Sequence, residues 1–283
     1  MTFQDRLFLA AQFLLPHQTL SRLIGWFAES EWPIIRMPLM RFFLKRYGID
    51  LSEAQRTSLS DYRNFNDFFT RALATNARDL SSRPEAWLSP VDAAVSQFGK
   101  INEGQVIQAK GKSYSVEALL GGHAGMAERY NNGDFITLYL SPKDYHRIHM
   151  PRQAKLISTT FIPGRLFSVN PLTASHVDNL FARNERLVCE FESEAGRFVM
   201  VLVGAMVVAS IETTWAGIIA PFQRRIVQQH FNSQAIEFAQ AEEMGRFRLG
   251  STVIMLFEPG QIQWSNEIQP EATVKLGQPL NQA

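Results

Sequence analysis

Four residues of this 283-residue sequence carry side chains suited to acid–base and nucleophilic chemistry. Asp92 lies among apolar residues in SPVDAAVSQF, His146 and His149 follow an apolar run in LYLSPKDYHRIHMP, and Ser251 precedes the apolar run TVIMLF. A carboxylate among apolar neighbours is costly unless it is paired, and two histidines within four residues favour proton transfer. The residue types together suggest an acid–histidine–serine set, in which the aspartate orients an imidazole that takes the hydroxyl proton.

Each of these residues also has a simpler interpretation. Asp92 alone is more often a helix N-cap or an ion-pair partner, and a single histidine is usually structural. The His-x-x-His spacing comes without further recognisable ligands, so no metal site is expected. Ser251 has no G-x-S-x-G context and enters a strand instead of opening a helix, which argues against an ordinary serine hydrolase. A Gly-Ser pair before a strand is in most proteins a turn.

The first 73 residues, by contrast, have the apolar spacing of amphipathic helices. Pro16 and Gly48 are natural helix stops. The expected helices lie within residues 5–15, 20–30, 38–48 and 58–73.

From about residue 84 the pattern changes to short β-like runs separated by turn signals such as NNGD and EPGQ. The expected strands are residues 135–141, 154–162, 186–193, 198–208 and 251–257, and one short helix is expected within 235–247. The sequence therefore predicts an α+β protein, with a helical N-terminal region at residues 1–73 on a β-rich catalytic body at residues 84–283.

Composition excludes several classes of protein. With 46% hydrophobic and 19% charged residues the chain can bury a large core, and its net charge of +1 gives no field that would attract nucleic acid. The single cysteine, Cys189, excludes an internal disulfide and a cysteine-based metal site, and its strand-like context RLVCEFES predicts a buried thiol. No stretch reaches the ~18–20 apolar residues that cross a bilayer, and the N-terminus lacks the cleavage site of a signal peptide.

Residues 1–48 combine a local net charge of +3 with many aromatic residues. Six cations (Arg6, Arg22, Arg36, Arg41, Lys45, Arg46) stand against three acids (Asp5, Glu29, Glu31). Such helices suit the headgroup layer of an anionic membrane, where rings enter the acyl boundary and guanidiniums meet lipid phosphates. The alternative, which composition alone favours, is that these faces pack on the protein's own core.

A series of motifs in fixed order closely resembles the bacterial phosphatidylserine decarboxylase family. These motifs are FNDFFTR (65–71), SPVDAAVSQFGKI (89–101), QAKGKSYSVEALL (108–120), YLSPKDYHRIHMP (139–151), PGRLFSVNPLT (163–173), NLFARNER (179–186), VGAMVVASIET (203–213) and EMGRFRLGSTV (243–253). Each motif is weak alone, but their order and the LGST signature are specific, and no chemical position departs from the family pattern.

The resemblance implies that the Gly250–Ser251 bond is the first substrate of the enzyme. Asp92 and His149 would activate the Ser251 hydroxyl against the preceding carbonyl, and the chain would separate into a β chain of residues 1–250 and an α chain of residues 251–283. Ser251 would become a covalent pyruvoyl group, the cofactor, whose ketone forms a Schiff base with phosphatidylserine and accepts the electrons released with CO2. The product would be phosphatidylethanolamine.

For His146 the resemblance implies contact with the substrate carboxylate and help with proton transfer. Carboxylate binding favours a charged ring whereas proton uptake requires a neutral one, and the sequence leaves this choice open.

Family members of this type work at the cytoplasmic face of the bacterial inner membrane, so the resemblance favours peripheral attachment to an anionic membrane surface through the N-terminal helices. It leaves a homodimer open. Two alternatives remain: a lipid-directed serine hydrolase that uses the same side chains, and a non-catalytic peripheral lipid-binding module in which Ser251 is only a turn.

Overall fold

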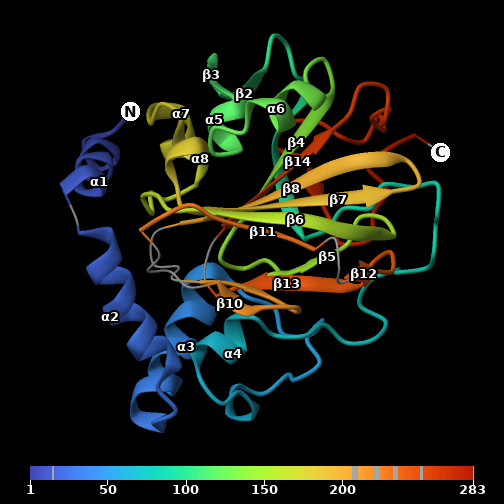
Figure 1. The fold of residues 1–283 in the computed structure, drawn as a ribbon. Helices are drawn as coiled ribbons and strands as arrows, with labels where there is room; N and C mark the ends of the chain where they lie inside the picture. The colour runs from blue at the N-terminus through green and yellow to red at the C-terminus, as the bar shows by residue number, and fades with distance from the viewer. Residues whose placement is uncertain (15, 206–209, 220–223, 232–234, 249–250, 283) are drawn as a thin grey trace.

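A nine-stranded antiparallel sheet organises the chain (Figure 1). The computed structural model describes residues 1–14, 16–205, 210–219, 224–231, 235–248 and 251–282. Within them the sheet order is β11-β6-β7-β8-β14-β4-β1-β15, with β12 also paired to β6. Its strands are β1 (Ala93–Lys100), β4 (Asp134–Leu140), β6 (Ala154–Ile162), β7 (Arg186–Ser193), β8 (Gly196–Gly204), β11 (Val227–His230), β12 (Glu237–Phe238), β14 (Ser251–Phe257) and β15 (Thr273–Val274).

Two smaller sheets accompany it. A four-stranded sheet has the order β10-β9-β13-β5, and β2 and β3 form a hairpin. Their strands are β2 (Gln105–Ala109), β3 (Lys112–Ser115), β5 (Arg147–His149), β9 (Ile211–Thr213), β10 (Gly217–Ile219) and β13 (Glu243–Phe247). In Figure 1 the four-stranded sheet lies below the large sheet.

The helices fall into two groups. Helices α5 to α8 lie above the large sheet in Figure 1, whereas α1, α2 and α3 run down one side of the molecule. The helices are α1 (Phe3–Leu14), α2 (His17–Glu29), α3 (Pro33–Tyr47), η1 (Leu59–Asp61), α4 (Phe65–Phe69), α5 (Val116–Leu119), α6 (Ala124–Arg129), α7 (Pro171–His176) and α8 (Leu180–Arg183).

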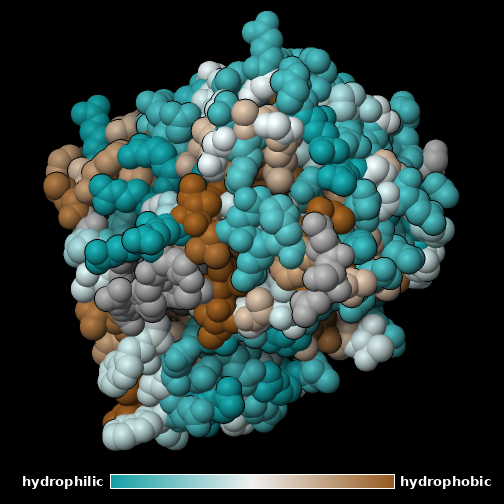
Figure 2. All heavy atoms as spheres, viewed as in Figure 1, coloured by the Kyte–Doolittle hydropathy of each residue, from teal (hydrophilic) through white to brown (hydrophobic). Residues whose placement is uncertain are grey.

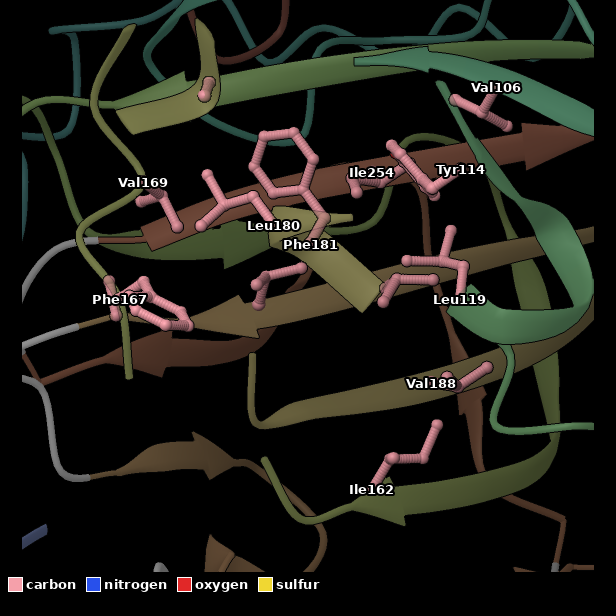
Figure 3. Packing of buried hydrophobic residues seen from close by; sticks show 14 of the residues in the cluster. Val106, Tyr114, Leu119, Ile162, Phe167, Val169, Leu180, Phe181, Val188 and Ile254 are labelled. Atoms are coloured by element: carbon pink, nitrogen blue, oxygen red, sulfur yellow. The ribbon is translucent and has the colours of Figure 1, made fainter. Parts of the chain in front are cut away.

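Strand β14 is buried on both faces of the large sheet. Ile254 and Leu256 belong to the core under the helices, while Val253, Met255 and Phe257 belong to the core on the opposite face. Figure 3 shows α8 placing Leu180 and Phe181 over the sheet near Ile254. Burial on both faces explains why TVIMLF is continuously apolar instead of alternating, because every side chain loses water contact and adds about 1.5–3 kcal/mol of transfer free energy.

The α+β class and the positions of the expected strands are confirmed by this architecture. Gly48 ends α3 in the left-handed conformation (φ 62°), as expected, and the Cys189 thiol is buried in β7. Helix α3 begins at Pro33, earlier than expected, and has Pro38 inside it. Residues 206–208 of the expected strand 198–208 lie outside the described residues.

The helix expected within residues 235–247 is wrong. This segment forms β12 and β13 instead, and β13 pairs with both β5 and β9. Gly245 allows the close approach, because a Cβ there would lie 2.5 Å from the carbonyl oxygen of Glu212. Met244 and Phe247 are fully buried, so tertiary packing overrides the helix-forming composition of the segment. Residues 58–73, likewise, contain only the short elements η1 and α4.

The N-terminal helices expose an unusual amount of apolar surface. Of the sixteen large apolar side chains exposed in the described residues, twelve lie before residue 48: Met1, Phe3, Leu7, Phe13, Leu14, Leu23, Trp26, Phe27, Trp32, Ile34, Phe42 and Tyr47. Figure 2 shows hydrophobic residues at the edge of the molecule formed by α1. The described helices include none with the length and hydropathy needed to span a bilayer.

Candidate active site

The start of β14 lies in a row of paired residues that connects three strands. Ser251 pairs with Leu140 of β4 and with Gly204 of β8. In the next row Tyr139 lies between Thr252 and Ala94, and because neighbouring strands are about 4.8 Å apart, Thr252 and Ala94 are about 10 Å apart. Asp92 directly precedes β1, so the backbone of Ser251 and the Asp92 segment lie at the same end of these neighbouring strands. The Ser251 side chain and Gly250 fall outside the described residues.

The segment that follows β4 carries His146 in a loop and His149 at the end of β5, and it is fixed at two points. The Asp144 carboxylate accepts hydrogen bonds from the backbone amide and the hydroxyl of Ser141, each at 2.7 Å, and Ser141 follows the residue that pairs with Ser251. The backbone amide of His149 donates to the carbonyl of Pro90 at 2.9 Å. The fold thus brings the segments that hold all four predicted site residues together at one end of the strands β1, β4 and β14.

His149 has a defined tautomer. Its Nδ1–H donates to the carbonyl of Ala241 at 2.7 Å, and its Nε2 accepts from the hydroxyl of Tyr145 at 2.9 Å. Burial lowers the pKa of His149, although the hydrogen bond to Ala241 opposes the shift. The ring is therefore neutral near pH 7, with its basic nitrogen in contact with a tyrosine hydroxyl.

His146 is buried and neutral. Its Nδ1–H donates to the carbonyl of Asp144 at 2.8 Å, and its ring packs on Phe69 with centroids 4.0 Å apart. Burial lowers the pKa of His146 to about 3, despite the opposing hydrogen bond to the carbonyl of Asp144. Its Nε2 has no hydrogen-bond partner among the described residues. Of the two states that the sequence left open, the structure supports the neutral ring with a free basic nitrogen.

Asp92 is an ion-pair partner. Its carboxylate accepts from Nε of Arg78 at 3.0 Å, from the backbone amide of Leu276 at 2.8 Å and from Nζ of Lys275 at 3.3 Å. Burial alone would raise the pKa of Asp92, but the hydrogen bonds of Arg78 and Leu276 outweigh it and hold that pKa below its usual value. The expected contact from Asp92 to His149 is absent from the described hydrogen bonds, and the Ala241 carbonyl holds the tautomer instead.

A cavity of about 450 Å³ opens beside these residues. Asp92, Arg78 and Tyr145 line it, as do Tyr139 and Ser141, which flank the partner of Ser251 on β4. A cavity of this size accommodates a small polar ligand. The described residues contain no group of histidine, cysteine, aspartate or glutamate side chains arranged to hold a metal ion.

Sequence reasoning gave no role to three residues of this site: Arg71, Arg78 and Tyr145. Arg71 ends the motif FNDFFTR and lines the cavity, and Tyr145 stands four residues before His149. The spacing of four residues between Tyr145 and His149 was the one feature of the sequence that could have suggested their contact. Arg78 lies in a segment without regular structure, so no pattern connects it to Asp92.

Comparison with known proteins gives consistent matches over the whole chain. The family model described as phosphatidylserine decarboxylase matches residues 65–282, and a model described as PSD matches residues 7–48. The chain is 50% identical to the phosphatidylserine decarboxylase proenzyme of Bordetella petrii, over 99% of this chain and 98% of the relative. It is 51% identical to the proenzyme of the same name from Pseudomonas fluorescens, over 98% and 97% of the two chains, and 48% identical to that of Pseudomonas aeruginosa, over 99% and 98%.

Proposed function

Because this chain belongs to the phosphatidylserine decarboxylase family of enzymes, we propose that it converts phosphatidylserine to phosphatidylethanolamine and CO2 after cutting itself before Ser251. The observation that carries this proposal is the position of Ser251 at the first paired residue of β14, opposite Leu140, whose neighbours Tyr139 and Ser141 line a polar cavity. The Arg78–Asp92 ion pair and Tyr145, the partner of His149, line the same cavity. The relatives' description as proenzymes supports the cutting step.

Self-cutting begins at the Ser251 hydroxyl. Its oxygen attacks the carbonyl carbon of Gly250, the peptide nitrogen leaves that carbon, and an ester replaces the amide. Loss of the Ser251 α-proton then expels the Gly250 carboxylate and leaves dehydroalanine, which takes up water and releases ammonia to become a pyruvoyl group. Attack within one chain has a large effective concentration, because the hydroxyl and carbonyl belong to adjacent residues.

His149 is the base that we assign to this step. Its neutral ring keeps a lone pair on Nε2, and that nitrogen accepts from the hydroxyl of Tyr145, which lines the cavity. In this scheme the Tyr145 hydroxyl takes the proton of Ser251 while passing its own to His149. Asp92, which Arg78 keeps ionised, acts by charge: its carboxylate stabilises the histidinium that forms.

The pyruvoyl group would supply a ketone that forms a Schiff base with the serine amine and draws in the electrons released with CO2. The site fits such a group, since it would be made from Ser251 itself, and the buried Thr252 hydroxyl beside it has no partner among the described residues. His146 presents a neutral nitrogen at this end of the strands, suited to holding a proton between the loss of CO2 and product release.

Attachment to an anionic membrane is the second part of the proposal. Trp26 of α2 and Trp32, which directly precedes α3, are 66% and 71% exposed, and amphipathic rings of this kind favour the bilayer interface. Gly48, which ends α3, also lines the cavity. A headgroup would thus reach the cavity from the side of α3 while its acyl chains stay in the membrane. In a bacterium the protein would attach to the cytoplasmic face of the inner membrane.

Ser251→Ala tests the proposal. The unsubstituted protein should separate on denaturing electrophoresis into residues 1–250 and residues 251–283, with intact mass showing a blocked N-terminus on the smaller fragment and with decarboxylation sensitive to hydrazine. The variant should remain one chain and be inactive. An active protein that stays uncut would refute self-processing. Labelling of an intact chain at Ser251 by a fluorophosphonate would instead favour a lipid-directed serine hydrolase, and vesicle binding without turnover a lipid-binding module.

A further inference from the structure

Arg71 is a buried cation without a counter-anion in the described part of the chain. The residue lies shortly after the end of α4 and is only 5% exposed. Nη2 donates to the carbonyl of Lys143 at 2.7 Å and more weakly to that of Asp144 at 3.4 Å, whereas Nη1 is buried with no partner among the described residues. A buried guanidinium held only by carbonyl oxygens keeps most of its desolvation cost, since neutral acceptors do not cancel its charge.

The other charged side chains that line the cavity are ion-paired, hydrogen-bonded or exposed: Lys143 is exposed, and the Asp50 carboxylate accepts from the hydroxyl of Ser52 at 2.7 Å. Arg78 is neutralised by Asp92 and Glu53, and Lys275 contacts the same Asp92 carboxylate. The Asp144 carboxylate is held by Ser141. Arg71 lines the cavity with these residues and is, among the described lining residues, the buried cation without an ion pair, so a ligand that brings an oxyanion would pair with it.

Arg71 is also connected to His146. The carbonyl of Asp144 accepts from Nη2 of Arg71 and from Nδ1 of His146. Each of the two side chains therefore has one nitrogen fixed on the same oxygen and one nitrogen, Nη1 or Nε2, without a partner among the described residues. One of these nitrogens is a charged donor and the other is a neutral acceptor, so only Arg71 can hold an anion by charge.

We propose that Arg71 binds the phosphodiester of the phosphatidylserine headgroup through its unpartnered Nη1 and thereby positions the serine moiety for reaction. This inference rests on the proposed function for the identity of the lipid. A guanidinium matches phosphate oxygens in charge and in geometry. With access from the side of α3, through Gly48 at the cavity lining, the serine moiety would enter first and the phosphodiester behind it would come to lie at Arg71.

The phosphodiester suits Arg71 better than the serine carboxylate does. The carboxylate loses its charge as CO2 departs, so a cation bound to it stabilises the ground state more than the transition state and slows the reaction. The phosphodiester keeps its charge throughout, and its contact with Arg71 holds substrate and transition state equally. This assignment predicts an effect of Arg71 on KM more than on kcat.

The test uses the uncut Ser251→Ala chain, whose headgroup binding can be measured without decarboxylation. Glycerophosphoethanolamine, which has the phosphodiester but no carboxylate, should bind in calorimetry, and inorganic phosphate should bind more weakly. L-serine, which has the carboxylate but no phosphate, should show no binding that depends on Arg71. Adding Arg71→Gln should weaken glycerophosphoethanolamine binding roughly tenfold or more, with Arg71→Lys intermediate because it keeps charge without the fork.

Arg186→Gln is the matched control. Arg186 is another buried arginine held by carbonyls, those of Ala118, Leu119 and Asn184, and it is not among the residues that line the cavity. It should lose stability but keep affinity for glycerophosphoethanolamine, with near-ultraviolet circular dichroism showing that each chain is folded. In the processed enzyme Arg71→Lys should raise KM several-fold with a smaller change in kcat.

The assignment would be overturned if folded Arg71→Gln and Arg71→Lys bound glycerophosphoethanolamine as tightly as the parent chain does. It would also be overturned if the Arg71 variants lost binding of L-serine and kept binding of glycerophosphoethanolamine. Headgroup binding that depends on Arg71 without turnover in the unsubstituted protein would refute the decarboxylase and keep the subsite. Turnover that does not depend on Arg71 would do the reverse.

Discussion

Arg78 and Asp92 form a buried ion pair in which Nε and Nη2 of the guanidinium meet the two oxygens of the carboxylate. The two side chains are 6% and 5% exposed. The pair ties a segment without regular structure to the first residue before β1, and the same carboxylate accepts the backbone amide of Leu276 close after β15. Asp92 thus connects three parts of the chain that border the cavity.

Replacing Arg78 with methionine should destabilise the protein by about 3 kcal/mol, because a buried carboxylate is left with Lys275 as its remaining cation. Urea unfolding in the uncut Ser251→Ala background measures this on a single species. Arg63→Met, which removes an exposed pair with Glu31, should change the stability by well under about 1 kcal/mol. Equal losses in the two variants would contradict the assignment of a buried, structurally important pair.

Tyr145→Phe should slow self-cutting roughly 10- to 100-fold, because the basic Nε2 of His149 loses its hydroxyl partner and its connection to the cavity. The fraction of cut chain is followed over time during cell-free synthesis. Tyr130→Phe is a suitable control, since the Tyr130 hydroxyl is buried without a partner among the described residues. Normal cutting in Tyr145→Phe would assign the hydroxyl to packing alone.

Acid should destabilise the fold through His146. Its folded pKa of about 3 lies below its ordinary value of 6.5, so between these values the unfolded chain binds a proton that the folded chain does not. Stability therefore falls as pH falls below 6.5, by up to about 1.4 kcal/mol per pH unit from this residue. Urea unfolding at pH 7 and pH 5 should show a smaller loss for His146→Gln than for the parent chain. An unchanged loss would mean that His146 is charged or exposed.

The exposed tryptophans of the N-terminal region should control membrane binding. The double change Trp26→Glu/Trp32→Glu should weaken sedimentation with anionic vesicles roughly tenfold or more, because each ring contributes apolar transfer free energy and each carboxylate is repelled. Self-cutting should continue, since both side chains lie outside the cavity. Ile218→Glu, at an exposed position of β10, should leave vesicle binding unchanged. Unaltered binding in the double variant would place the membrane contact elsewhere.

The sequence predicted the elements whose side chains follow a simple pattern. Strand β14 was recognisable because a run of apolar residues followed a turn signal, and Gly48 was recognisable as a helix stop. The helix expected at 235–247 failed because pairing with β5 and β9 is invisible in local composition. The four candidate site residues were identified by type and by resemblance, and their segments do meet at one end of the strands β1, β4 and β14.

The partners of those residues were not predictable in the same way. Asp92 bonds to Arg78, 14 positions earlier, and to Leu276, 184 positions later, and no periodicity relates such distant residues. The group that orients His149 is the backbone carbonyl of Ala241, and a carbonyl has no signature in a sequence. For Arg71, charge alone could not show that the residue is buried without a counter-anion in the described part of the chain.

Strand β14 pairs along its whole length with β4 and β8 in the middle of the large sheet. A break in the backbone before Ser251 would leave these two rows of hydrogen bonds unchanged, so the short C-terminal piece would remain locked between its neighbours. Mature and immature molecules would then have the same hydrodynamic size and elute together from a native column. Exchange of the short piece between molecules would require the central sheet to open, and a mixture of isotopically labelled and unlabelled enzyme should keep its original pairings for as long as it stays folded.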